Sequence, residues 1–231
     1  MSETPETMRE RLLQAALSHV PFDGWSEASF RAACADLGIT PALGRAIFPR
    51  GAVDLALAYH AAGDEAMLAR LADTDLSALR FRDRIAAAVR FRLEAADREA
   101  VRRGTTLFAL PQHAAEGAKA IWGTADAIWR ALGDSSDDLN WYTKRATLSG
   151  VYGATVLYRL GDETPGAEAT WAFLDRRIED VMRFEGAKAK LREAPLLSKL
   201  LAGPAWLAGK VHAPGPRPDG LPGVLRRAGR T

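Results

Sequence analysis

Residues 26–48 read SEASFRAACADLGITPALGRAIF and determine how the start of the chain folds. Ser26 is a typical N-cap, because its side-chain oxygen can accept a hydrogen bond from a free amide of the first helical turn. Gly38 is typical of the residue that ends a helix. Thr40 and Pro41 repeat the start signal, as an N-cap followed by proline at the first helical position. Two short helices joined by this tight turn, with a further helix before them, predict a helix-turn-helix.

Helical patterns continue on both sides of this stretch. Apolar residues recur every three or four positions, alanine and leucine greatly outnumber the strand formers isoleucine and valine, and proline or glycine separates the segments. We therefore predict an all-α protein, with further helices at about 6–20, 52–72, 77–103, 105–110, 114–132, 138–160 and 165–191. A helix-turn-helix followed by a larger helical bundle resembles the layout of TetR-type regulators, which implies a ligand cavity and a dimer interface in the bundle.

Length and composition exclude several classes of protein. A chain of 231 residues can bury a core without disulfides, and its single cysteine, Cys34, leaves no disulfide framework and no cysteine cluster for zinc. No run approaches the roughly 20 apolar residues of a membrane span. Residues 1–10 are acidic rather than a basic presequence. We expect a soluble protein of a reducing compartment.

The predicted third helix is poorly suited to reading DNA. DNA binding needs cations at phosphates and polar groups at base edges. Residues 1–50 carry a net charge of −1, and the third helix offers one cation, Arg45. Ala46 and Ile47 stand where TetR-type readers usually carry Tyr and His. We expect no nucleic-acid partner, and a TetR-type transcriptional regulator with a hydrophobic ligand remains the alternative.

The sequence offers no catalytic motif. No metalloprotease, nucleophile-elbow, phosphate-loop or dinucleotide signature occurs, and none of the four histidines lies in the Glu-x-x-His pair of di-iron bundles. His60 and Asp64 are one turn apart, which we interpret as a surface pair. Asp137 or Asp138 before an apolar helix is most simply an N-cap. We expect a protein that is not an enzyme, with no cofactor and no metal.

Residues 133–145, GDSSDDLNWYTKR, form the most unusual segment of the chain. They place its only asparagine, Asn140, two aromatic residues and two cations at the start of a helix. Trp141 and Arg145 are four positions apart, so their side chains can stack. Here the chain closely resembles the accessory protein of ubiquinone biosynthesis, the ninth of the COQ proteins. Further matching segments are 19–25, 48–51, 90–94, 109–111 and 170–178.

This resemblance implies a TetR-like homodimer that has lost DNA binding, holds isoprenoid lipids in its bundle and supports demethoxyubiquinone hydroxylation. The aromatic and charged cluster then becomes a partner-docking surface for the hydroxylase, formed by Asp134, Asn140, Trp141, Tyr142, Lys144 and Arg145. The competing interpretation is that Trp141 packs inward and Arg145 only pairs with a carboxylate such as Asp134. Candidate lipid-binding residues are Phe108, Leu110, Trp122, Trp129, Leu148, Tyr152, Val156 and Phe173, for which core packing is the alternative.

The last 44 residues of the chain, 188–231, are basic and include an amphipathic segment. Residues 188–231 carry a net charge of +7, and residues 195–211 predict an amphipathic helix. Its candidate membrane residues are Leu196, Leu197, Lys199, Leu200, Leu201, Trp206 and Lys210; docking on the bundle or on the dimer partner is the alternative. We divide the chain into a helix-turn-helix part (1–50), a lipid-binding and dimerisation bundle (51–194), the amphipathic segment (195–211) and a disordered basic tail (212–231).

The sequence thus predicts a non-catalytic accessory protein that binds isoprenoid quinone precursors and presents them to a membrane-associated hydroxylase. The acidic start of the chain suggests a bacterial member of the family. We expect it to be cytoplasmic and peripheral on the inner membrane.

Overall fold

The structure is a computed structural model that describes residues 5–193 and 213–214. These residues form only helices: α1 (Pro5–Asp23), α2 (Glu27–Asp36), α3 (Pro41–Ile47), α4 (Ala52–Asp73), α5 (Phe81–Glu94), α6 (Arg98–Phe108), α7 (Ala114–Ala131), α8 (Leu139–Gly161), a 3₁₀ turn η1 (Pro165–Ala167) and α9 (Glu168–Glu193). The prediction of an all-α fold is confirmed. Among these helices none is sufficiently long and apolar to cross a bilayer.

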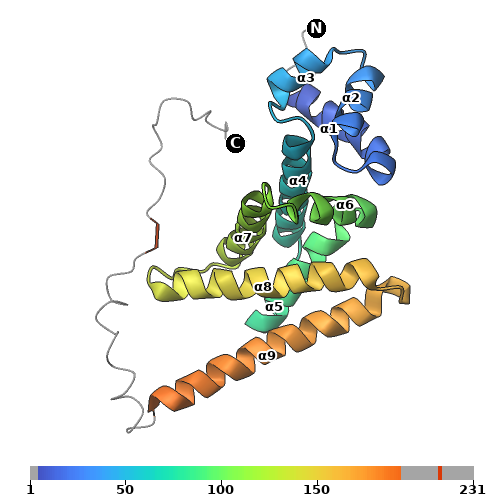
Figure 1. Cartoon of the computed structure of the whole chain (residues 1–231). Coiled ribbons are helices and arrows are strands. Elements are labelled where there is room, and N and C mark those ends of the chain that lie inside the picture. Colours follow the sequence, from blue (N-terminus) through green and yellow to red (C-terminus); the bar gives the residue numbers. More distant parts are fainter. Residues whose placement is uncertain (1–4, 194–212, 215–231) are drawn as a thin grey trace.

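The helix-turn-helix forms as the sequence predicts. Ser26 and Thr40 each accept a hydrogen bond, of 3.3 Å, from the amide three residues ahead. At Gly44 a Cβ atom would lie 2.6 Å from Cys34 Sγ, so glycine allows α3 to lie close against α2. Helices α1–α3 lie at one end of the molecule, and α4 leads from them into the bundle (Figure 1).

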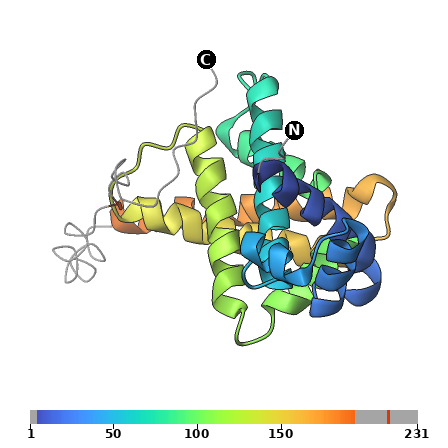
Figure 2. The ribbon, with the colours of Figure 1, turned by 90° about the horizontal axis from the view of Figure 1, so that it is seen from above.

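Helix α4 belongs to both hydrophobic cores. Leu55 packs in the first core with Leu12, Phe30 and Phe48, while Met67, three turns later, packs in the second core among residues of α5 and α7–α9. Helices α8 and α9 run across the far end of the bundle (Figure 1), and α7 lies across α8 when seen from above (Figure 2).

Three predicted boundaries are wrong. Helix α1 continues through Pro21 to Asp23, since a proline in the last turn removes only one amide donor. The helix expected over 77–103 is two helices, because Asp97 caps a new one by accepting the Ala100 amide at 2.8 Å. The helix expected over 105–110 is the end of α6.

Candidate functional site

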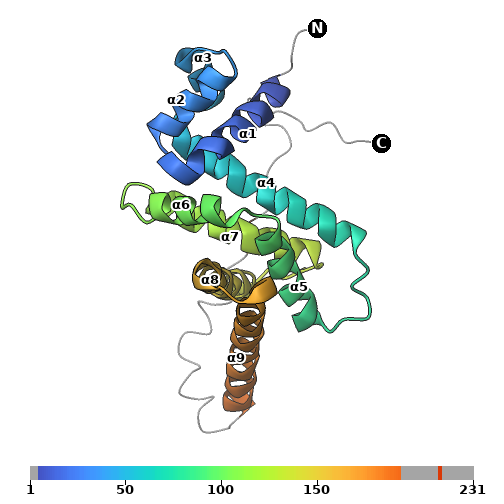
Figure 3. The same ribbon diagram turned by 90° about the vertical axis from the view of Figure 1, so that its right-hand side faces the viewer.

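A cavity of about 530 Å³ opens between α4, α6, α7 and α8, with Arg92 and Leu93 of α5 in its wall. Figure 3 shows these helices stacked between the helix-turn-helix and α9. The lining is mainly apolar and comes from helices far apart in sequence; it includes Ala56, Leu93, Val101, Ile121, Val156 and Leu157. The volume lies within the roughly 300–1,000 Å³ of small-molecule sites.

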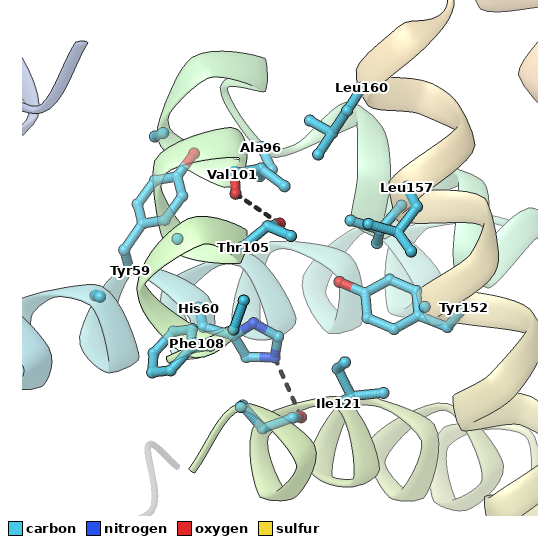
Figure 4. Close-up of a pocket in the computed structure, with 18 of the residues that line it drawn as sticks. Tyr59, His60, Ala96, Val101, Thr105, Phe108, Ile121, Tyr152, Leu157 and Leu160 are labelled. Atoms are coloured by element: carbon cyan, nitrogen blue, oxygen red, sulfur yellow. Dashed lines mark hydrogen bonds between the residues drawn. The ribbon is translucent and has the colours of Figure 1, made fainter. Parts of the chain in front are cut away.

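One part of the cavity wall is polar (Figure 4). Arg92, whose side chain is 4% exposed, donates from Nε to Asp64 Oδ1 at 2.6 Å and from Nη2 to the His60 carbonyl at 2.9 Å. Thr124 donates to the same Asp64 oxygen at 2.9 Å. His60 Nε2 lies 2.8 Å from Thr124 Oγ1 and 3.2 Å from the Ala120 carbonyl. The buried charges therefore compensate each other.

Burial changes the titration of the groups in this wall. It lowers the pKa of His60, and the Arg92 charge lowers it further, so the imidazole is neutral at pH 7. Burial also raises the pKa of Tyr152 to about 12, which keeps its hydroxyl protonated. The interpretation of His60 and Asp64 as a surface pair is wrong, because Arg92 and Thr124 cover them from α5 and α7.

The structure separates the eight candidate lipid-binding residues. Phe108, Tyr152 and Val156 line the cavity. The other five lie outside it: Leu110 is exposed, Leu148 is buried in the second core, Trp122 contacts Trp141, Trp129 donates to the Lys144 carbonyl, and Phe173 stacks on Tyr158. Helical periodicity identified the apolar residues but not the face that each one presents.

Sequence reasoning missed most of the cavity wall. His60 and Arg92 were each part of a recognised pattern, the His60–Asp64 spacing and the segment 90–94, but nothing local places these patterns side by side. Tyr59 and Trp25 also line the cavity and were not proposed. Arg92 follows its partner Asp64 by 28 positions, and no sequence pattern at that separation indicates that two side chains pair.

The segment before α8 is held by a second buried ion-pair cluster. Arg145 binds Asp126 at 2.6 Å and Asp134 at 2.9 Å, and Lys144 binds Asp134 at 2.7 Å. The side chains of Arg145 and Asp134 are each 2% exposed. Burial acts to raise the pKa of Asp134, but hydrogen bonds from Lys144, Arg145 and Ser136 outweigh it and lower the pKa to about 2.

This cluster changes the expected docking surface. Asp134 and Arg145 are interior residues, so they position the segment and do not face a partner. Trp141 is half-buried, with the Arg145 guanidinium carbon 4.0 Å from its ring centroid and Tyr142 against its edge. Asn140 is exposed and donates to Asp138. The pairing of Arg145 with Asp134, which the competing interpretation required, is present.

Two further sets of residues were singled out by the sequence. Arg45, the cation of α3, forms an ion pair of 2.6 Å with Glu27 of α2. All seven candidate membrane residues, and the tail from 215 onward, lie outside the described residues.

Comparisons with known proteins identify relatives of this chain. A family model named COQ9 matches residues 114–185. The chain is 31% identical over 189 residues to "Ubiquinone biosynthesis protein COQ9, mitochondrial" of Rattus norvegicus, covering 78% of this chain and 60% of that protein. The Homo sapiens protein of the same name is 29% identical over 189 residues, covering 78% of this chain and 59% of that protein. This chain therefore spans about 60% of the length of these relatives.

A solved structure shares the fold. The TetR transcriptional regulator from Nitrosomonas europaea matches with a TM-score of 0.62 and 19% identity, over 74% of this chain and 96% of that one. At this identity the likeness concerns the fold alone. The similarity of sequence is to the ubiquinone biosynthesis proteins, and residues 114–185 match the model of the COQ9 family.

Proposed function

We propose that the chain is a non-catalytic accessory protein of ubiquinone biosynthesis that binds an isoprenoid quinone precursor and presents it to a membrane-associated hydroxylase. The observation that carries this proposal is the largely apolar cavity of about 530 Å³. An isoprenoid chain leaves a bilayer only at a cost of about 0.8 kcal/mol per exposed CH₂, so a carrier must replace the surrounding lipid with apolar side chains. The names of the relatives support the pathway.

A cavity-filling variant tests lipid binding. Gly153 lines the cavity, and a Cβ atom there would meet Ile121 Cδ1 at 3.9 Å, so a longer side chain fits only by entering the cavity. Native mass spectrometry of the wild type should show a bound isoprenoid lipid that Gly153→Leu lacks. Gly150→Leu is the matched control, because this exposed glycine of α8 has nothing within 4 Å of its Cβ position. A Gly153→Leu protein with full lipid content would contradict the proposal.

Docking of the hydroxylase belongs to the proposal as well, at the surface of Trp141, Tyr142, Lys144 and Asn140. Half-buried aromatic residues beside cations are typical of interface anchors. Trp141→Ala should weaken hydroxylase binding about tenfold or more while lipid content remains normal. Leu43→Ala, at an exposed apolar residue of α3 at the other end of the molecule (Figure 1), serves as control. Loss of thermal stability with unchanged binding would instead favour the packing role of Trp141.

Self-association and membrane contact complete the proposal. Leu157, Tyr158 and Met182 expose apolar surface on α8 and α9, at 60%, 39% and 52%. A homodimer would cover this surface, and sedimentation velocity tests whether the chain is a dimer in solution.

The proposed location is peripheral on a membrane, with the basic, amphipathic end of the chain as the contact.

A transcriptional regulator is the second candidate, favoured by the TetR fold. The ion pair between Arg45 and Glu27 argues against a regulator, because it neutralises the one cation of α3, the helix that would contact DNA bases. Selection on random duplex DNA at physiological salt should return no enriched motif. An enriched motif would replace the lipid carrier with a lipid-responsive regulator.

A further inference from the structure

In the polar wall of the cavity, the neighbours of Thr124 determine which atom donates and which accepts in its hydrogen bond with His60. Thr124 has one hydroxyl proton, and its neighbours Asp64 Oδ1, at 2.9 Å, and the Ala120 carbonyl, at 3.3 Å, are acceptors only. Thr124 Oγ1 must therefore accept from His60 Nε2, 2.8 Å away. The Ala120 carbonyl, 3.2 Å from the same nitrogen, imposes the same direction. The ring proton of His60 thus resides on Nε2.

The second ring nitrogen is consequently an acceptor. In a neutral imidazole protonated at Nε2, Nδ1 carries a lone pair. The described hydrogen bonds of the His60 ring use Nε2, and 20% of the side chain is accessible. In Figure 4 the dashed line from the His60 ring is the contact of Nε2 with the Ala120 carbonyl, and the other ring nitrogen lies away from that contact. The hydroxyl of Tyr152 hydrogen-bonds with Thr124.

Other polar groups of the lining are committed elsewhere. Trp25 Nε1 donates to the Ala100 carbonyl at 3.0 Å, and the Thr105 hydroxyl donates to the Val101 carbonyl at 3.0 Å. Tyr59 accepts the Asp97 amide at 2.7 Å. The charge of Arg92 is compensated by Asp64. The part of the wall around His60 therefore offers a neutral acceptor rather than a net charge.

We propose that His60 Nδ1 binds the hydroxyl of the lipid, so that the cavity selects a neutral amphiphile with an O–H donor, an isoprenoid alcohol or phenol. This inference rests on the proposed function, because it requires lipid in the cavity. Arg98 and Arg159 also line the cavity, and they define the opposing outcome, in which an anionic head group binds at the arginines.

Three probes of one chain length separate these outcomes: farnesol, farnesyl methyl ether and farnesyl diphosphate. The ether keeps the oxygen and removes the donor. Calorimetric titration of the full chain should show that the alcohol binds roughly three- to tenfold more tightly than the ether, as expected for one hydrogen bond. His60→Phe should abolish this preference and retain affinity for the ether. Thr106→Val, at an exposed threonine of α6 that lies outside the cavity lining and donates to the Arg102 carbonyl, should leave the preference unchanged.

The wild-type comparison decides the matter even if His60→Phe does not fold. Equal affinities for alcohol and ether, or tighter binding of the diphosphate, would overturn the inference while lipid binding itself stands. A folded His60→Phe protein that keeps the preference would overturn it too. If none of the three probes binds, the proposed function fails, which is a different result.

Discussion

Arg145 shows how much one residue determines at the start of α8. Its guanidinium joins Asp126 of α7 to Asp134 of the preceding turn and lies over the ring of Trp141. Two carboxylates converge on this single buried cation. Such a pair adds modest net stability against an apolar replacement, but removal of one member leaves buried charge uncompensated.

Arg145→Ala should therefore lower the free energy of unfolding by about 3–5 kcal/mol, as measured by urea denaturation. Arg130→Ala is the matched control, because Arg130 pairs with the same Asp126 but is 72% exposed, and should cost at most about 1 kcal/mol. Equal effects of the two substitutions would show that the buried cluster contributes no more than the surface pair.

The lowered pKa of Asp134 predicts that the free energy of unfolding depends on pH in the acid range. Its pKa is about 2 in the folded chain against an ordinary 3.8, so the ionised carboxyl stabilises the fold above about pH 4, by about 2 kcal/mol. This contribution disappears as the pH falls from 4 toward 2. The difference in unfolding free energy between the wild type and Asp134→Asn should therefore be largest above pH 4 and shrink at lower pH. A difference that is constant from pH 2 to 6 would contradict the assignment.

At the scale of elements, the sequence predicted helices better where capping chemistry is local. The caps at Ser26 and Thr40 are confirmed because each depends on an amide three residues away. The break before Asp97 was missed, although its cap is equally local, because helical periodicity continues across it. The sequence predicted that the bundle holds a ligand cavity but not which residues line it. The wall joins residues of α4 and α8, whose proximity depends on tertiary packing.

Helix α4 contains a glycine that the fold requires. A Cβ atom at Gly63 would lie 2.5 Å from Arg92 Nη1, and Asp64 and the His60 carbonyl hold that guanidinium in place. Gly63→Ala should cost about 1–3 kcal/mol in thermal or urea unfolding. Gly150→Ala in α8, where the Cβ position is open, should instead stabilise the chain by about 0.5–1 kcal/mol. A stabilising Gly63→Ala would mean that Arg92 moves freely.

For the whole molecule, the described bundle ends with α9, and the net charge of +7 belongs to residues 188–231. Deletion of residues 195–231 should leave cooperative unfolding intact and reduce flotation with anionic vesicles, because basic residues near a membrane surface contribute about 1 kcal/mol each. Vesicles of neutral lipid serve as control. Unchanged flotation on anionic vesicles would assign membrane contact to the bundle.

The shared position of α4 links the two ends of the molecule thermodynamically. Leu55 and Met67 lie on one continuous helix, so melting of either core removes part of the other. Calorimetry should record a single transition whose calorimetric and van't Hoff enthalpies agree. A lipid present at 100 times its dissociation constant would then add about 2.7 kcal/mol to the stability of both ends at once. When lipid binds in the cavity, which is lined mainly by α4 and α6–α8, amide hydrogen exchange in α1–α3 should therefore slow as well.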